Sequence, residues 1–316
     1  MLNGWSWPVV AMLMAAGVVL DLLLGEPRRL HPLVGFGRLA NAIERSLNKA
    51  GARIARGALG WALAVLPITA ASVLLCQSPM GLAAHAVLLY LCIGLRSLRE
   101  HNLPIAEALR AGDLPSAREL TARIVSRDTQ GASASDLAKA STESLLENGN
   151  DAVFGTLFWF AVAGGPGAVL FRLANTLDAM WGYRSPRFLE FGRVAARIDD
   201  ALNYIPARLT ALSYVLLAPG RKARLRALYC WRTQAPQWSS PNAGPVMSTG
   251  AGALGLALGG AAVYDGELEQ RPPLGMGMEA EAADIRRAWQ LVALATLLWL
   301  GLALFCAIIA FGVWHA

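Results

Sequence analysis

The 316-residue sequence has little charge and very little lysine. Charged residues make up 16% of the chain and hydrophobic residues 55%, whereas a typical soluble domain is about 25% charged. This balance disfavours both a freely soluble enzyme and a disordered chain. Three of the 28 basic residues are Lys, and no GxxxxGKS/T motif is present, so no P-loop lysine is available for a nucleotide.

The sequence also lacks the signatures of cysteine chemistry and of covalent acyl transfer. The four Cys show neither CxxC nor Cys/His ligand spacing, so neither a disulfide framework nor a zinc site is indicated. No GxSxG motif is present. If a nucleotide binds, its phosphates must therefore be held by Arg side chains and by Mg²⁺ that carboxylates coordinate.

Long uncharged apolar runs are what the sequence has instead. Trp5–Leu24 carries only Asp21, residues 57–95 carry no charge, and Trp289–Val313 carries none. A turn at Gln77–Gly81 divides the second run. These runs predict four transmembrane helices, at 5–24, 59–76, 82–95 and 289–313. Because no basic residue precedes the first, we expect an uncleaved anchor rather than a signal peptide.

The positive charges lie between these runs, which is typical of cytoplasmic loops and not of a nucleic-acid partner. The basic segment 26–58 is expected in the cytoplasm, so the N-terminus and the Gln77–Gly81 turn are expected outside. Residues 96–152 return to the cytoplasm as amphipathic helices, with a break at Gly112–Pro115.

Three further apolar stretches are shorter or broken. Gly164–Gly167 splits the stretch that starts at Val153, which predicts a re-entrant or interior helical hairpin rather than a span. Leu209–Ala218 is short, and Val246–Tyr264 is rich in Gly and Ala, which suits close helix packing. No convincing alternating strand is found. The prediction is an all-α polytopic membrane protein, one membrane-embedded domain over 1–316, with a polar-motif core of broken apolar segments over 153–264.

The first polar cluster runs from Glu143 to Asp151. Glu143 and Glu147 are four residues apart and share one helix face. Gly149 is expected to cap that helix, which leaves Asp151 at or just past its end. Together with Asn148, these carboxylates suit Mg²⁺. The alternative is a solvated helix face.

Two more clusters follow. Asn175–Tyr183, with Asp178 at its centre, comes after the broken stretch, where an ionisable group is a functional candidate; ordinary helix caps are the alternative. Residues 197–208 combine acidic side chains with Arg, which suits a metal–phosphate complex. There, Arg197 and Asp200 could instead pair on a helix surface. Ser239–Pro245 reads as a structured loop.

In this order, the clusters resemble the CobD/CbiB family of cobalamin biosynthesis from about residue 15 to 290. The matching residues are Asp21, Gly25-Glu26-Pro27, His31-Pro32, Arg127-Asp128-Thr129, Glu143, Glu147-Asn148, Asp151, Asn175-Thr176-Leu177-Asp178, Met180, Gly182-Tyr183, Arg197-Ile198-Asp199-Asp200, Asn203, Pro206-Ala207-Arg208-Leu209-Thr210 and Ser240-Pro241-Asn242-Ala243-Gly244. Glu26, Ser126 and Trp238 depart from the usual Asp, Gly and His.

The resemblance implies a multi-pass protein of the cell (inner) membrane, an adenosylcobinamide-phosphate synthase whose active site faces the cytoplasm. It would join aminopropanol or its O-phosphate to the free carboxylate of adenosylcobyric acid. Such an amide bond forms most simply through an acyl phosphate from ATP, with Mg²⁺ and Arg stabilising the phosphate charge. Neighbouring membrane enzymes of the pathway and a second copy of the chain are candidate partners.

The residues that would carry this chemistry fall into three groups. The expected catalytic residues are Glu143, Glu147, Asp178, Asp199 and Asp200. The expected metal ligands are Glu143, Glu147, Asp151 and Asp178. The expected substrate-binding residues are His31, Arg127, Asp128, Thr129, Asn148, Asn175, Tyr183, Arg197, Asn203, Arg208, Ser240 and Asn242. For His31, a structural role is the commoner alternative.

Two other classes of protein stay open at this point. A related branch, resembling AmpE-type membrane proteins, is sensory rather than catalytic. A transporter of an amphipathic substrate would also use broken helices with polar ends.

Overall fold

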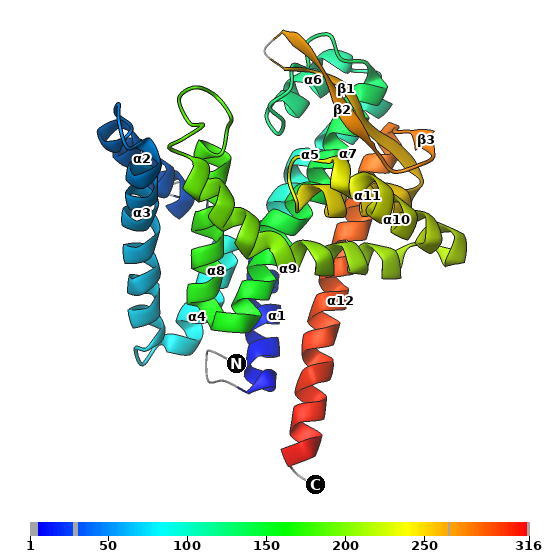
Figure 1. Ribbon diagram of the computed structural model, residues 1–316. Helices are drawn as coiled ribbons and strands as arrows, with labels where there is room; N and C mark the ends of the chain where they lie inside the picture. Colours follow the sequence, from blue (N-terminus) through cyan, green and yellow to red (C-terminus); the bar gives the residue numbers. More distant parts are fainter. Residues whose placement is uncertain (1–5, 28–30, 265, 315–316) are drawn as a thin grey trace. The chain divides into compact units, whose positions relative to one another are not determined.

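The structure is a computed structural model that describes residues 6–27, 31–264 and 266–314, with side chains described up to residue 310 (Figure 1). The chain divides into two compact units. The first consists of Met1–Gly94, Asp151–Asn203 and Leu300–Ala316, and the second of Leu95–Asn150 and Tyr204–Trp299. The single domain over 1–316 stays a prediction.

The first unit is helical. Its elements are α1 (Trp7–Leu24), α2 (Pro32–Leu47), α3 (Arg53–Cys76), α4 (Gly81–Cys92), most of the π-helical turn η1 (Asn150–Phe154), α8 (Gly155–Trp181), the start of α9 (Arg193–Leu217) and the end of α12 (Ala282–Trp314). Helix α8 packs against α3 and α4, and α4 also packs against α1.

The second unit combines helices with a small sheet. It contains α5 (Leu95–Arg110), α6 (Leu114–Ala122), α7 (Ala134–Gly149), the rest of α9, α10 (Gly220–Gln234), the 3-10 turn η2 (Ala235–Gln237), α11 (Ala243–Leu254), β1 (Leu256–Tyr264), β2 (Glu267–Leu274), β3 (Met278–Glu279) and the start of α12. The amphipathic helices expected over 96–152, and their break at Gly112–Pro115, are confirmed as α5, α6 and α7.

Five helical segments among the described residues are long and apolar enough to cross a membrane. They are Trp7–Leu24, Arg53–Cys76, Gly81–Arg110, Ala134–Trp181 and Ala282–Ala310. The predicted helical, multi-pass class is therefore confirmed. The predicted hairpin of 59–76 and 82–95 is present as α3 and α4, joined by a turn in which the Gly81 N–H donates to the Ser78 carbonyl at 2.8 Å. The predicted start of the first span, Trp5, lies outside the described residues.

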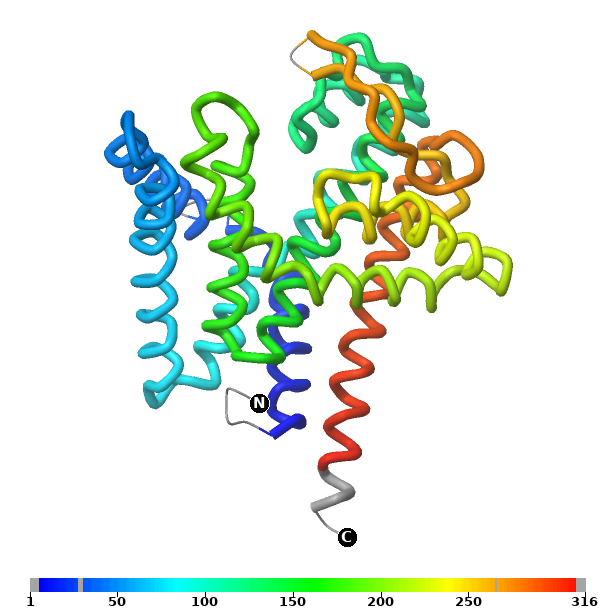
Figure 2. Tube along the Cα trace, viewed as in Figure 1, coloured from blue at the N-terminus to red at the C-terminus, as the bar shows by residue number. Residues whose placement is uncertain are grey.

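The predicted hairpin within the broken apolar stretch is confirmed. Figure 2 shows that α8 reverses its direction, and the non-helical backbone of Gly164, with φ +68°, is where its two helical parts join. A Cβ added at Gly155 would lie 2.1 Å from the ring of Phe171, whereas a straight helix would separate these residues by about 24 Å. The Gly165 N–H freed at the turn donates to Nδ1 of His85 at 2.8 Å. This backbone N–H thus finds its hydrogen-bond acceptor within the protein, as a membrane environment requires.

Both ends of α8 lie at one end of the first unit. Near its start, the Ala152 carbonyl accepts the Gly94 N–H after α4 at 3.1 Å. After its end, Arg187 pairs with Glu44 of α2 at 2.6 Å. Because α3 and α4 form a hairpin, the end of α4 and the α2–α3 junction lie on the same side of that hairpin. Helix α8 therefore enters and leaves on the side of the basic segment 26–58.

One local prediction holds in part and another was wrong. Helix α7 ends at Gly149, which leaves Asp151 just past its end as predicted, but Gly149 is not a cap, because the chain continues through η1 into α8. Its small size serves packing instead: an added Cβ would lie 3.0 Å from the Tyr214 hydroxyl and from Val292.

Val246–Tyr264 is likewise not one apolar segment. Helix α11 ends at Leu254 and is capped by Gly255, which has φ +73°, and β1 follows. Strand β1 pairs antiparallel with β2 and parallel with β3. The strand was not predicted from the sequence, because its Gly and Ala residues give no alternation of apolar and polar side chains.

Candidate active site

Four aspartates come together in the first unit. Asp151 lies on η1, Asp178 near the end of α8, and Asp199 and Asp200 on the first turns of α9. Asp178 and Asp151 are 27 residues apart in the sequence, and the reversal of α8 brings them close together.

Two asparagine side chains donate hydrogen bonds to carboxylates of this aspartate cluster. Nδ2 of Asn203 donates to Oδ1 of Asp151 at 3.3 Å and to Oδ2 of Asp199 at 3.3 Å. Nδ2 of Asn175 donates to Oδ1 of Asp199 at 3.3 Å. The structure therefore groups six residues that the sequence placed in three separate clusters.

Asp199 is buried among other carboxylates. Asp199 is 6% exposed. Its burial raises its pKa well above the ordinary value, and repulsion from Asp151 and Asp178 raises it further. Burial also raises the pKa of Asp200, although Arg184 opposes that shift. Such a site favours either a proton or a bound cation.

The donor set suits a cation that arrives with a substrate. Among the described residues, no three His, Cys, Asp or Glu side chains are placed to hold a metal ion by themselves. Mg²⁺, however, is usually held by one or two carboxylates together with substrate phosphates and water. Asp151 and Asp178, which both lie close enough to Asp199 to repel its carboxylate, meet that requirement.

Glu143 has a different environment, in the second unit. Its carboxylate pairs with Arg127 and with Arg271, whose Nη1 lies 2.9 Å from Oε2. Its Oε1 also accepts the Gly259 N–H at 2.7 Å. Two cations thus neutralise this carboxylate, and the contacts join the loop before α7, α7 itself, β1 and β2. Neither Arg271 nor Gly259 was predicted from the sequence.

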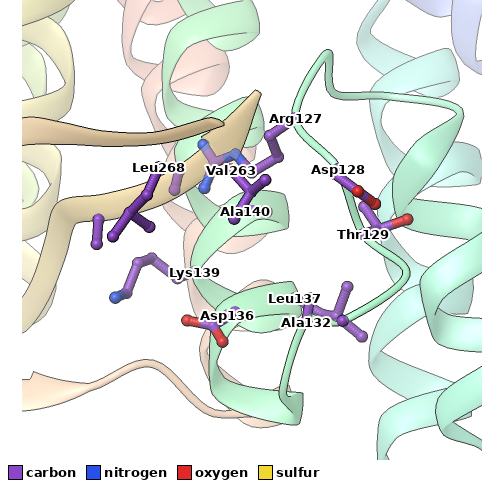
Figure 3. A pocket seen from close by; sticks show the side chains of 13 residues that line it. Arg127, Asp128, Thr129, Ala132, Asp136, Leu137, Lys139, Ala140, Val263 and Leu268 are labelled. Atoms are coloured by element: carbon purple, nitrogen blue, oxygen red, sulfur yellow. The ribbon is translucent and has the colours of Figure 1, made fainter. Parts of the chain in front are cut away.

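The Arg127-Asp128-Thr129 segment lines a cavity of about 320 Å³ in the second unit (Figure 3). Asp136 and Lys139 of α7 and apolar residues of the β1–β2 hairpin complete the lining. The Asp128 N–H donates to the Val263 carbonyl at 2.8 Å, which fixes the loop to β1. The cavity therefore mixes two cations with two carboxylates at its wall. Asp136 and Lys139 were not predicted as site residues.

Arg208 and Asn242 lie together in the second unit. Nη1 of Arg208 donates to Oδ1 of Asn242 at 2.6 Å, and its guanidinium lies 3.7 Å from the centre of the Tyr204 ring. Oγ of Ser240 accepts the Asn242 N–H at 3.3 Å, which orders the loop. With Trp238, Arg208 lines a cavity of about 670 Å³.

The remaining predicted residues lie apart from these groups or on the surface. His31 caps α2 by accepting the Leu33 N–H at 3.1 Å, and Asn148 donates to the Ser144 carbonyl at 3.0 Å. Glu147 is half-buried on α7 in the second unit. Tyr183 and Arg197 are exposed. Their roles in binding or catalysis stay predictions.

Comparison with known proteins identifies the family. The family described as CobD/Cbib protein matches residues 14–292. Among curated relatives named "Cobalamin biosynthesis protein CobD", that of Stutzerimonas stutzeri is 57% identical over 300 residues, covering 94% of this chain and 96% of its own. That of Chromobacterium violaceum is 52% identical, covering 97% and 99%. That of Mycobacterium tuberculosis is 39% identical, covering 90% and 91%. No solved structure matches the chain.

The family match spans most of the chain, including the aspartate cluster and the Glu143 ion pairs. This chain therefore belongs to the CobD/CbiB family and has a role in cobalamin biosynthesis.

Proposed function

We propose that this protein forms the amide bond between aminopropanol, free or as its O-phosphate, and the free carboxylate of adenosylcobyric acid, using Mg·ATP. The observation that carries the proposal is the aspartate cluster of Asp151, Asp178, Asp199 and Asp200. Asp199 is buried and the other three are half-buried, and Asp199 is repelled by Asp151 and Asp178, which favours a cationic ligand.

The reaction proceeds in two steps. A carboxylate oxygen of adenosylcobyric acid attacks the γ-phosphorus of ATP, ADP leaves, and an acyl phosphate forms. The aminopropanol nitrogen then attacks the acyl carbon, phosphate leaves, and the nitrogen gives up a proton. Both transition states concentrate charge on phosphoryl oxygens, which cations stabilise.

The aspartate cluster supports two separate roles. Asp151 and Asp178 would hold Mg²⁺, which would neutralise the charge of the ATP phosphates. Asp199, whose pKa is raised by burial and by its acidic neighbours, takes the proton from the attacking amine. Asn175 and Asn203 keep the Asp199 carboxylate in place.

Glu143 has a positioning role in this proposal. Because two arginines and one N–H occupy its oxygens, it orders Arg127 at the wall of the 320 Å³ cavity. Arg127 and Lys139 are the cations there that can bind a phosphate or a propionate group.

The proposed setting is the inner membrane, with the aspartate cluster on the cytoplasmic side. The basic segment 26–58 supports this orientation, since positive loops stay in the cytoplasm. Both ends of α8 lie on the side of that segment. Water-soluble ATP and the polar amine reach the cluster from this side.

The test is direct synthesis by the purified full-length protein in lipid nanodiscs. With adenosylcobyric acid, aminopropanol phosphate and Mg·ATP, we expect a product of the amide's mass and one ADP per product. Asp178→Asn should lower the rate at least about 10²-fold, the scale of one lost transition-state contact. Glu107→Gln, at an exposed position of α5, is the matched control and should keep the wild-type rate. Absence of product from the wild-type protein with all three substrates would contradict the proposal.

A further inference from the structure

One stretch of the second unit is entirely without acidic residues. Residues 204–264 contain no Asp or Glu, yet they contain six basic residues. Five of these lie on α10: Arg221, Lys222, Arg224, Arg226 and Arg232. Such a one-sided charge favours an anionic surface as partner.

The neighbouring part of α9 has an uncovered apolar stripe. Ile205, Leu209, Leu212 and Leu216 follow one another at intervals of four, three and four residues, so they share one helix face. Their exposed fractions are 55%, 38%, 44% and 59%. Tyr204 next to the stripe is also exposed. A helix with an exposed leucine stripe and a tyrosine beside it is typical of a membrane interface.

The contacts of α9 with α12 place this stripe along a membrane-spanning helix. The Trp299 indole N–H donates to Oγ of Ser213 at 2.9 Å. From Ala288 onward α12 carries no charge, and its outward residues Leu294 and Leu297 are 51% and 64% exposed. Figure 1 shows the second-unit part of α9 running across α12 rather than along it. Helix α9 thus meets α12 at Trp299, about 7.5 Å along the helix past Leu294, which is the depth to which interfacial helices enter the bilayer surface.

Helix α10 presents its basic residues to solvent. Arg221, Lys222 and Arg224 are exposed, and so are Leu225 and Tyr229 on the same helix. Arg226 is used internally, since its Nε donates to the Gly252 carbonyl at 2.6 Å. The exposed cations therefore accompany exposed apolar and aromatic side chains, which is the composition of helices that lie on anionic lipid.

We propose that residues 204–217 of α9, together with α10, lie in the plane of the cytoplasmic bilayer surface and bind anionic phospholipid. The α9 stripe enters the acyl boundary, and Arg221, Lys222 and Arg224 contact the lipid phosphates. The cytoplasmic leaflet supplies the matching negative charge. This inference does not rest on the proposed amide synthesis.

Contact of the α9 stripe with lipid is tested by photo-crosslinking of the full-length protein in nanodiscs. A benzophenone amino acid replaces Leu209 or Leu216, and the control position is Arg110, which is exposed at the end of α5. After irradiation, we expect phospholipid adducts at positions 209 and 216 by mass spectrometry and none at position 110. Equal adduct formation at all three positions, or none at 209 and 216, would overturn the proposal.

The charged half is tested by lipid selectivity. Full-length protein is purified from membranes containing phosphatidylglycerol, and its bound lipids are quantified. Arg221→Gln/Arg224→Gln should lower the retained phosphatidylglycerol, relative to neutral lipid, at least about fivefold. Arg99→Gln/Arg110→Gln removes the same charge from exposed positions of α5 and should leave the ratio unchanged. An unchanged ratio in the α10 variant, or an equal loss in both variants, would contradict anionic-lipid binding by α10.

Discussion

Glu143 and Asp199 are equally buried carboxylates with opposite surroundings. Their exposed fractions are 2% and 6%. Glu143, in the second unit, is matched by Arg127 and Arg271. Asp199, in the first unit, is held by two amides and is repelled by Asp151 and Asp178. A carboxylate paired with two cations can be explained by folding alone, whereas a buried carboxylate among like charges is a candidate for a functional site. The surroundings of the two carboxylates therefore separate the proposed positioning residue from the proposed catalytic one.

The largest effect on stability is expected for Glu143→Gln. This change leaves Arg271, whose side chain is 8% exposed, as a buried cation without its carboxylate. Removing one partner of a buried ion pair costs about 3–5 kcal/mol, which corresponds to a fall in thermal midpoint of roughly 10 °C. The measurement is thermal unfolding of the purified protein in detergent. Glu107→Gln is the control, since it removes the same charge from the surface, and an equal midpoint in both variants would contradict a structural role for Glu143.

The next largest effect is expected on catalysis, for Asp199→Asn. Amide synthesis should fall at least about 10²-fold. The thermal midpoint should stay at the wild-type value or rise, because the change removes repulsion from Asp151 and Asp178. The two variants thus predict opposite outcomes, one losing stability and the other losing activity. A loss of stability in Asp199→Asn comparable to that of Glu143→Gln would abolish the distinction.

The third expected effect is a pH dependence of stability. A carboxyl whose folded pKa is raised favours the protonated folded state, so its contribution is fully present below the unfolded pKa of about 3.9. That contribution is lost as pH rises through the raised pKa of Asp199. Without divalent cation, the thermal midpoint of the wild-type protein should therefore fall, relative to Asp199→Asn, as pH rises. Parallel pH curves for the two proteins would contradict the raised pKa.

Much of the first unit could be predicted from the sequence because its signals are local. Residues 57–95 carry no charge and are too many for one membrane-spanning helix, so the turn at Gln77–Gly81 predicted the α3–α4 hairpin. The Gly164–Gly167 run likewise indicated the reversal of α8, since Pro166 lacks an N–H and glycine permits the positive φ that Gly164 adopts.

The second unit was harder to predict because its contacts join distant residues. Arg271 and Glu143 are paired although they are 128 residues apart in the sequence. A single Arg in a polar segment does not indicate which residue it pairs with. The Gly and Ala residues of β1 pack as a strand without the alternation that marks one. The sequence indicated which carboxylates were notable, but their charge balance depends on these long-range contacts.

The smallest expected effect concerns a third carboxylate, Glu44 of α2, which pairs with Arg187 at 2.6 Å. Its side chain is 3% exposed, but that of Arg187 is 60% exposed, so water and salt screen the pair. The hydrogen bond from Arg187 is the main cause that lowers the pKa of Glu44, so the stabilisation is present at neutral pH and is lost as pH falls through that pKa. A double-mutant cycle of Glu44→Gln and Arg187→Gln, by thermal unfolding at pH 7, should give a coupling of about 0.2–1 kcal/mol. The coupling should shrink in high salt, whereas the effect of Glu143→Gln should not. A coupling as large as the cost of Glu143→Gln would mean that exposure of one partner does not decide the strength of an ion pair in this protein.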